Sequence, residues 1–377
     1  MIYLDHAATT PPCKAALDAF LQEATLGANP SSMHRAGFHA HTRLEDYRKS
    51  IARTVGARPE EITFTSGGTE SANIALFGAA RALKRRGTRI LVSDAEHPCV
   101  SECMKALEAE GFDVVRIPTR GGSLDLEAID KAATEETILA AFMLVNNETG
   151  ALFDVARAFT LVKSRCKHAV CFCDCVQAYG KLPVSLCALC ADVLSLSAHK
   201  IHGVRGVGAL VVKSGVRLVS PVFGGGQEKG LRSGTENSPA IAAFAAAASE
   251  AHEHLAERAE TMKSRKARLE RGLSALSGVK LHSGFLQAPH VVSAAFEGYK
   301  SEVLLHLLSE HGICVSAGSA CSSKKGAKSP ILLAHALSAA EADSTLRFSL
   351  SYTTTEEEID TTLSVLEELL TKGRYRK

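Results

Sequence analysis

Short apolar runs alternate with longer amphipathic segments from about Glu61 to Val212. Buried runs rich in β-branched residues, each followed by a helical pattern, are typical of βα units that build a mostly parallel sheet. The predicted strands are Ile62 to Thr65, Ile90 to Ser93, Val114 to Ile117, Ile138 to Val145, Val170 to Cys173, Val193 to Leu196 and Gly208 to Val212. The predicted helices between them include Glu70 to Arg86, Cys99 to Glu110, Leu126 to Ala133 and Val155 to Cys166. The pattern predicts an α/β fold whose seven-stranded sheet is covered on both faces.

The pattern changes after Ser238-Pro239, where an Ala-rich stretch leads into one rich in Glu, Lys and Arg up to about Leu276. We expect one long helix here, which leaves a first domain and enters a second. The remainder of the chain mixes apolar strands with helices, which is typical of a smaller α+β domain. Its predicted elements are the strands Val291 to Phe296, Ile313 to Ser316 and Thr345 to Leu350 and the helices Ser301 to Glu310 and Thr355 to Leu370.

Composition and charge exclude several classes of protein. The chain has 377 residues with 43 Lys plus Arg and 41 Asp plus Glu, so it offers no basic excess to nucleic acid or anionic lipid. The longest apolar run, Ala240 to Ala248, is far shorter than the roughly 18 residues that span a bilayer. The N-terminal sequence MIYLDHAATT does not resemble a secretory signal. We therefore expect a cytoplasmic enzyme without nucleic acid or membrane as a partner.

Eleven cysteines are a high number for such a chain, and six of them fall in one short stretch: Cys166, Cys171, Cys173, Cys175, Cys187 and Cys190. Cys187 and Cys190 form a CxxC pair, so a metal site shared with the strand thiols is one interpretation. The other is that strand cysteines in a reducing compartment act as small apolar fillers. We favour the second, with no resident metal ion.

Chemically distinctive residues follow the predicted strands. Lys200 comes just after one strand, at the end where α/β sheets place ligands, and can form a Schiff base with a carbonyl cofactor. Asp174 ends another strand, and the glycine turn Ser66 to Thr69 leads into a helix whose start suits a phosphate. Pyridoxal phosphate requires such a lysine, an acid at its ring nitrogen and a phosphate cup. His97, after a third strand, is placed to stack on the ring and move protons.

Nine motifs, in order, make the chain similar to the cysteine desulfurases, which belong to the class V aminotransferase group of fold-type I pyridoxal-phosphate enzymes. They are LDHAATT (4–10), FTSGGTES (64–71), EHP (96–98), VNNETG (145–150), DCVQ (174–177), SLSAHKIHG (195–203), GGGQEKGLRSGTEN (224–237), SAGSACSS (316–323) and RFSL (347–350). The resemblance spans nearly the whole chain. It implies a large cofactor-binding domain over residues 15–257 and a small domain over 1–14 and 258–377.

The resemblance also implies a role for each matching residue. Lys200 would be the Schiff-base lysine, Asp174 the partner of the pyridine nitrogen, and His97 the ring stacked on the cofactor. Gln177 and Asn147 would lie near the ring hydroxyl, and Asn147 would also face the substrate. Gly68, Thr69, Ser197 and His199 would hold the phosphate. Thr235 would reach the phosphate of a partner subunit, which implies a homodimer, and Arg347 would bind the substrate carboxylate.

Cys321 distinguishes the reaction class. It lies among small residues in a loop of about 314–330, followed by Lys324, Lys325 and Lys328, which favour its thiolate. In the family such a thiol takes sulfur from L-cysteine as a persulfide and releases L-alanine. The sulfur would pass to an iron–sulfur cluster scaffold or a tRNA-thiolation relay protein, and Cys321 could serve as a transient iron–sulfur ligand.

Some residues depart from the family pattern. The chain reads His202-Gly203-Val204-Arg205-Gly206 where relatives have a proline and a lysine, and Cys175 replaces the usual alanine. The chain stops at Lys377, without the extension by which some relatives engage a scaffold, so the acceptor stays open. Two alternatives remain: a selenocysteine lyase or another class V aminotransferase, and a non-catalytic protein that binds a metal or a partner through its cysteine cluster.

Overall fold

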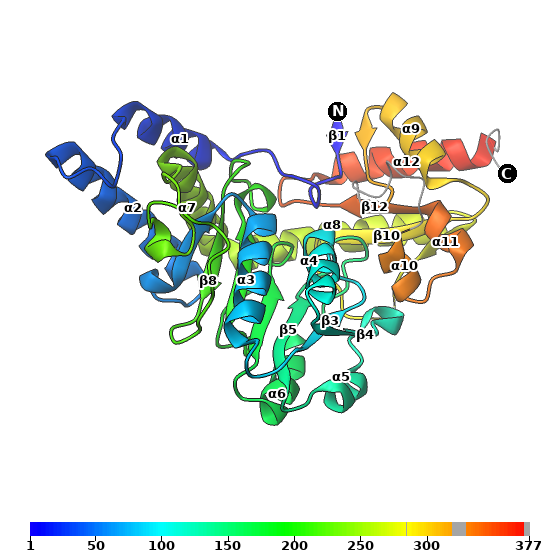
Figure 1. The fold of residues 1–377 in the computed structure, drawn as a ribbon. Helices are drawn as coiled ribbons and strands as arrows, with labels where there is room; N and C mark the ends of the chain where they lie inside the picture. Colours follow the sequence, from blue (N-terminus) through cyan, green and yellow to red (C-terminus); the bar gives the residue numbers. More distant parts are fainter. Residues whose placement is uncertain (284, 319–328, 373–377) are drawn as a thin grey trace.

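A seven-stranded sheet forms the centre of the molecule (Figure 1). The computed structural model describes residues 1–283, 285–318 and 329–372. All strands except β8 run in the same direction. The strand order is β2 (Ile62–Thr65), β8 (Gly208–Val212), β7 (Val193–Ser197), β6 (Val170–Asp174), β5 (Thr137–Met143), β3 (Arg89–Ser93) and β4 (Asp113–Ile117). The predicted α/β class and the seven mostly parallel strands are confirmed.

Strand β5 ends two residues earlier than the sequence pattern predicts. Val145 is as buried as the strand residues before it, but it pairs in an isolated bridge with Leu152. Between them Asn146 closes a turn, because its Oδ1 accepts hydrogen bonds from the amides of Glu148 and Thr149 at 3.0 and 2.9 Å. Apolar periodicity reports burial and cannot distinguish a strand residue from a buried turn residue.

Helices cover both faces of this sheet, as expected. One apolar cluster includes Ile90, Leu139 and Phe172 and lies under α3 (Gly68–Leu83) and α4 (Pro98–Ala109). The cluster on the opposite face includes Phe142, Cys171 and Leu196. It contains buried residues of α2 (Arg35–Thr54), α5 (Leu126–Ala132), α6 (Val155–Arg165) and α7 (Ser238–Glu253), and α1 (Lys14–Leu26) packs against α7.

The prediction of one long helix up to Leu276 is wrong, because the segment forms two helices. Helix α7 ends at Glu253, α8 (Leu255–Ala275) begins at Leu255, and His254 between them has φ −104° and ψ 15°. The alanine-rich α7 packs on α1 and α2, whereas the charged α8 packs on β9, β10 and α12. The two segments bury their apolar sides against different clusters, so the break lies where the composition changes.

A third apolar cluster is built from the C-terminal third of the chain and a short N-terminal strand. Its antiparallel sheet has the order β12 (Thr345–Ser349), β10 (Val291–Phe296) and β9 (Val279–Leu281), and β1 (Ile2–Tyr3) pairs in parallel with β11 (Ile313–Cys314). The helices here are α9 (Ser301–Glu310), α10 (Pro330–Ala334), α11 (Ala339–Ser344) and α12 (Glu356–Lys372). The domain boundary at residues 257 and 258 stays a prediction.

None of the helices within the described ranges has the length and apolar character needed to cross a membrane.

Five buried or half-buried histidines make acid stability a testable property of this fold. Burial is the main cause that lowers the pKa of each to about 4; they are His6, His199, His202, His282 and His335. The unfolded chain, with histidine pKa values near 6.5, therefore binds more protons between pH 6.5 and 4. We expect the free energy of unfolding to be highest above pH 6.5 and to fall below it. Each histidine that titrates contributes roughly 1 kcal/mol per pH unit.

Urea unfolding measured at pH 7.5, 6.5, 5.5 and 4.5 checks this expectation. The variant His282→Gln, which removes one buried ring, should show a shallower fall, and His306→Gln at an exposed site should follow the wild type. An unfolding free energy that stays constant from pH 7.5 to 4.5 would contradict it.

Candidate functional site

A cavity of about 260 Å³ lies at the edge of the central sheet where the parallel strands end. Parallel strands place their carboxyl ends at one edge, and open α/β sheets bind ligands there. Ten of the residues predicted from sequence line this cavity: Gly68, Thr69, His97, Asn147, Asp174, Gln177, Ser197, His199, Lys200 and Arg347. Thr235 is exposed and does not line it, and Cys321 lies outside the described residues.

Lys200 is placed by a short 3-10 turn, η3 (Ala198–Lys200), that follows β7 directly. Its Nζ donates to the carbonyl oxygens of Ala7 and Ala8 at 2.6 and 2.7 Å. The N-terminal segment is in turn bound to η3, because the amide and hydroxyl of Thr10 both donate to the carbonyl of His199. The first ten residues of the chain therefore complete the surroundings of the lysine.

Asp174 is the last residue of β6, and its carboxylate is held from one side. Its Oδ1 accepts hydrogen bonds from the Val176 amide at 2.9 Å and the Ser195 hydroxyl at 3.0 Å. Ser195 is its register partner on β7, so the parallel pairing itself supplies the hydroxyl. Only 6% of Asp174 is exposed, yet it lines the cavity. A fixed, buried carboxylate of this kind can hold a protonated ring nitrogen.

His97 caps the start of α4 and faces the same cavity. Its Nδ1 accepts a hydrogen bond from the Cys99 amide at 3.1 Å, so the neutral ring carries its proton on Nε2. Burial lowers the pKa of His97, the charge of Asp174 opposes that shift, and Lys200 adds to it. The ring is therefore neutral at neutral pH.

The glycine turn between β2 and α3 brings a helix N-terminus to the cavity. Gly67 has φ +151°, and a Cβ on Gly208 of the adjoining strand β8 would approach Gly67 Cα to 2.7 Å and the Leu196 carbonyl oxygen to 2.4 Å. The turn thus rests directly on the backbone of the sheet. Gly68 and Thr69 are the first residues of α3, whose amides and helix dipole favour an anion.

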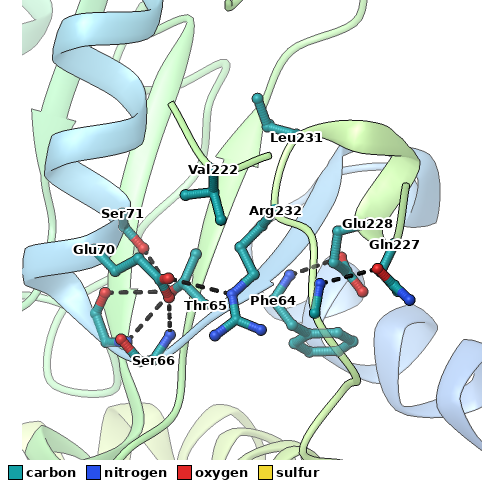
Figure 2. Close-up of polar contacts among 12 residues, drawn as sticks. Phe64, Thr65, Ser66, Glu70, Ser71, Val222, Gln227, Glu228, Leu231 and Arg232 are labelled. Atoms are coloured by element: carbon teal, nitrogen blue, oxygen red, sulfur yellow. Dashed lines mark hydrogen bonds and ion pairs between the residues drawn. The ribbon is translucent and has the colours of Figure 1, made fainter. Parts of the chain in front are cut away.

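The segment that carries Thr235 is bound to the glycine turn between β2 and α3 through side-chain contacts (Figure 2). Arg232 Nε donates to Glu70 Oε1 at 3.2 Å, and the other oxygen of that carboxylate accepts from the Ser66 amide. Glu228 Oε2 accepts from the Phe64 amide at 2.8 Å. Arg232 and Glu228 therefore tie this exposed segment to the end of β2 and to the start of α3.

Arg347 enters the cavity from β12, and its guanidinium is already oriented by two contacts. Nη2 donates to Asp5 Oδ1 at 2.7 Å and Nη1 to the Asn147 carbonyl oxygen at 2.8 Å. Its Nε is buried and has no hydrogen-bond partner in the described part of the chain. The remaining N–H groups suit a carboxylate, which the planar guanidinium binds in a fixed orientation.

The variant Arg347→Lys should weaken substrate binding more than it slows the chemistry, because an ammonium lacks the guanidinium's planar geometry. Charge-assisted hydrogen bonds contribute roughly 1.5 to 3 kcal/mol, so we expect KM for a substrate that carries a carboxylate to rise about 10- to 100-fold with a smaller change in kcat. Steady-state kinetics measure both values. Arg268→Lys, at a surface pair with Asp360, is the control. A normal KM with a strongly reduced kcat would assign Arg347 to another role.

The residues of the cavity fit pyridoxal phosphate. An amine, a carboxylate, a neutral imidazole and a helix N-terminus converge there, which is the donor set that this cofactor needs. In the described part of the chain, Asn147 Oδ1 is also buried without a hydrogen-bond partner. An unpartnered buried polar atom that faces a cavity indicates a polar ligand. Lys200, Asp174, His97, Gly68 and Thr69 are the residues that would hold the cofactor.

Four of the six clustered cysteines, Cys166, Cys171, Cys173 and Cys175, lie in the apolar core. Cys171, Cys173 and Cys175 are fully buried, and burial raises the pKa of Cys171 and Cys173. The CxxC residues Cys187 and Cys190 are exposed. Within residues 1–283, 285–318 and 329–372, no group of three or more His, Cys, Asp or Glu is arranged to hold a metal ion. Cys99 lines the cavity, but burial raises the pKa of its thiol strongly, so it is a poor thiolate.

Sequence reasoning missed the carbonyl groups of Ala7 and Ala8 and the carboxyl group of Glu96. Glu96 Oε1 accepts from the Ser93 hydroxyl at 2.5 Å and from the Met143 amide at 2.8 Å. Burial raises its pKa to about 8, so it is protonated at neutral pH and stabilises the loop that carries His97. Every residue has a backbone carbonyl, so residue type cannot identify the ones that contact the lysine. The available signal was the position of Ala7 and Ala8 within the motif LDHAATT.

Comparison with known proteins gives one consistent family. The class-V aminotransferase family matches residues 2–362. The cysteine desulfurase IscS of Escherichia coli (strain K12 / DH10B) is 38% identical, over 100% of this chain and 93% of the relative.

Solved structures agree. A NifS-like protein is similar with a TM-score of 0.92 and 35% identity, over 98% of this chain and 99% of its own. The structure described as SspA in complex with cysteine has a TM-score of 0.83 and 31% identity, over 94% of this chain and 100% of its own. The chain therefore belongs to the class V aminotransferase family and, within it, to the cysteine desulfurases.

Proposed function

We propose that this protein is a pyridoxal-phosphate-dependent cysteine desulfurase, a sulfurtransferase that converts L-cysteine to L-alanine and leaves a persulfide on Cys321. The observation that carries the proposal is the cavity itself. It joins Lys200, Asp174 and His97 with the N-terminus of α3, and Arg347 enters it from the second sheet. A relative in complex with cysteine supports the choice of substrate.

Each residue has a task that follows from its geometry. Pyridoxal phosphate, when bound, supplies an electron sink for the negative charge that develops next to the substrate nitrogen. Asp174 would keep the ring nitrogen of the cofactor protonated, and the N-terminus of α3 would bind its phosphate. Arg347 orients the substrate carboxylate. Lys200, which follows β7 and lines the cavity, would move the Cα proton of the bound substrate, and His97 has its Nε2 proton available to the cavity.

Cys321 performs the sulfur transfer. Its thiolate attacks the substrate Sγ, an S–S bond forms, and the substrate Cβ–Sγ bond breaks with its electron pair kept at Cβ, where a proton completes alanine. Both described flanks of its loop contact a residue that lines the cavity or the neighbour of one. Ser316 pairs with Arg347 through two backbone hydrogen bonds, and Ser329 Oγ lies 2.5 Å from Glu148 Oε2, next to Asn147.

A homodimer is part of the proposal. Thr235 is exposed on a segment tied to the phosphate turn, where a second subunit can meet it. Helices α1 and α2 and the link between them also expose large apolar side chains: Leu17, Leu21, Leu26, Met33 and Phe38. An apolar face of this kind favours association.

Sedimentation analysis should give twice the chain mass. An equimolar mixture of Thr235→Ala and Lys200→Ala chains should form hybrid dimers that recover activity in one of their two sites.

The sulfur then passes to an acceptor protein, an iron–sulfur cluster scaffold or a tRNA-thiolation relay protein, in the cytoplasm. A sulfur-transfer assay would identify the acceptor protein among these candidates. Incubation of the persulfidated protein with each candidate, followed by mass spectrometry, shows which one gains 32 Da of sulfur.

A single turnover with L-cysteine tests the proposed reaction. The holoenzyme should absorb in the near-ultraviolet to visible range and give one L-alanine and one persulfide per active site. An absorption band without alanine, together with a keto acid formed from the amino acid, would instead indicate an aminotransferase. L-selenocysteine in a parallel reaction tests the lyase alternative: turnover that does not need Cys321 would favour it.

A further inference from the structure

The Glu70 carboxylate lies beside the glycine turn that the proposed function assigns to the cofactor phosphate. Glu70 is the third residue of α3, and its Oε2 accepts a hydrogen bond from the Ser66 amide. Ser66 and Gly68 are two residues apart, so their Cα atoms are separated by at most about 7.6 Å. Gly68 and Thr69 line the cavity. A negative charge is therefore built in close to the helix N-terminus that faces the cavity.

Two anions would compete for the same helix N-terminus. The helix dipole favours the Glu70 carboxylate in the first turn of α3, and it favours a bound phosphate for the same reason. The two negative charges repel each other, because salt screens charges only beyond roughly 10 Å at moderate ionic strength. Helix stability explains the acid at this position, but it does not explain how the site accepts a second anion.

Arg232 supplies the opposite charge. Its Nε lies 3.2 Å from Glu70 Oε1, on the carboxylate oxygen that does not contact Ser66. Figure 2 shows the Arg232 side chain reaching across to Glu70 from the neighbouring segment. The two side chains are 26% and 22% exposed, so solvent screens this ion pair less than a fully exposed one. In the described part of the chain, this is the ion pair that Glu70 forms.

Contacts within the protein hold Arg232 in place. Its backbone forms an isolated parallel bridge with Val222. Four residues before it, Glu228 is bound to Arg48 by two hydrogen bonds of 2.7 and 2.8 Å, and only 2% and 5% of these two side chains are exposed. The guanidinium of Arg232 is therefore positioned next to Glu70 by its own segment.

The other ionisable groups of the cavity have different tasks. Lys200 donates to two backbone carbonyl oxygens and is assigned to the carbonyl group of the cofactor. Asp174 adds a further negative charge. Burial lowers the pKa of His199 to about 4, so that its ring is neutral at neutral pH, as the ring of His97 is. These groups leave the charge of Glu70 to be balanced by Arg232.

We propose that Arg232 is a positioning residue for the cofactor phosphate: it neutralises the Glu70 carboxylate, so that the N-terminus of α3 can bind a second anion. The inference rests on the proposed function, which assigns the phosphate of pyridoxal phosphate to this turn. It makes the sign of each charge decisive, whereas a merely structural link would require only that both side chains be present.

Two variants separate charge from structure. Arg232→Met removes the positive charge and keeps an apolar stem, so the uncompensated Glu70 should repel the phosphate. Glu70→Gln removes the negative charge, while its amide oxygen can still accept the hydrogen bond from Ser66. The positive charge of Arg232 should then attract the phosphate more strongly. The double variant lacks both charges and should resemble the wild type.

The test measures binding to the full-length protein after removal of its cofactor. Equilibrium dialysis gives the Kd of pyridoxal 5'-phosphate and, separately, of pyridoxal, which has the same ring and aldehyde but no phosphate. Both are measured at low and at high sodium chloride. Arg81→Met is the matched control, because Arg81 lies at the other end of the same helix and forms an ion pair with Glu110 at 2.8 Å.

We expect the Kd of pyridoxal 5'-phosphate to rise roughly 3- to 10-fold in Arg232→Met and to fall roughly 2- to 5-fold in Glu70→Gln. The double variant and Arg81→Met should bind as the wild type does, the Kd of pyridoxal should stay constant throughout, and high salt should reduce both shifts. Weaker binding in both single variants, or equal losses for both ligands, would overturn the inference.

Far-ultraviolet circular dichroism and thermal unfolding identify a variant that fails to fold. The remaining single variant then decides by the direction of its shift, because each is expected to change the Kd in its own sense. A wild-type protein that binds neither ligand, or binds both with the same Kd, would instead contradict the proposed function, because the phosphate would then have no site at the start of α3.

Discussion

Lys200→Ala should lose both the covalent attachment of the cofactor and the proton carrier at the substrate carbon. The absorption band of the purified protein should disappear or shift to that of free pyridoxal phosphate. Turnover of L-cysteine should fall by roughly 10²- to 10⁴-fold, which is the usual contribution of a positioned general acid or base. Absorption spectroscopy and alanine formation measure the two effects separately.

Lys213→Ala, at an exposed position after β8, is the matched control and should keep the spectrum and the rate of the wild type. We expect Lys200→Ala still to bind the cofactor noncovalently, because Asp174, His97 and the N-terminus of α3 are unchanged. A Lys200→Ala protein that keeps the absorption band and normal turnover would remove Lys200 from the proposed mechanism.

Cys321→Ala should abolish sulfur transfer and leave cofactor binding intact. The absorption band should be unchanged, because in the proposed mechanism Lys200 and Asp174 hold the cofactor. Alanine formation in a single turnover should fall by roughly 10³-fold or more, as is typical when a catalytic nucleophile is removed. The measurement is alanine and persulfide per active site after rapid mixing with L-cysteine.

Two other cysteines make this test specific. Cys314→Ala, on β11 near the same loop, should behave as the wild type. Cys99 is the thiol that lines the cavity in the described part of the chain, but burial raises its pKa and leaves it protonated. Persulfide that persists in Cys321→Ala and disappears in Cys99→Ala would transfer the nucleophilic role to Cys99.

The fold could be predicted largely because each strand is buried on both faces. Such strands appear as continuous apolar runs, and all seven were found within two residues of their ends. The exceptions have local causes: Asn146 closes a buried turn that periodicity cannot detect, and the break at His254 depends on which cluster each helix packs against. Tertiary packing decides both: apolar periodicity does not reveal the turn at Asn146, and the change in composition near His254 does not by itself show that the helix breaks there.

The residues of the candidate site could be predicted from the sequence less completely than the strands. Lys200 and Asp174 stand at strand ends, so topology alone brings them together at one edge of the sheet. Arg347 comes from another sheet, and its place in the cavity followed from family resemblance. The importance of Glu96 became visible only in the structure. The pKa of a buried ionisable group depends on partners that are distant in sequence. The predicted roles of all these residues stay predictions; Thr235 does not line the cavity, and Cys321 lies outside the described residues.

The contacts of Lys200 with Ala7 and Ala8 and of Arg347 with Asp5 have a consequence for biosynthesis. The cofactor cavity joins the first ten residues of the chain to residue 347, so it closes only after almost all of the polypeptide has left the ribosome. If the proposed cofactor binds there, a nascent chain is expected to lack pyridoxal phosphate at full affinity. Cofactor capture is therefore a late event that stabilises only completed molecules, and truncated products remain without that protection.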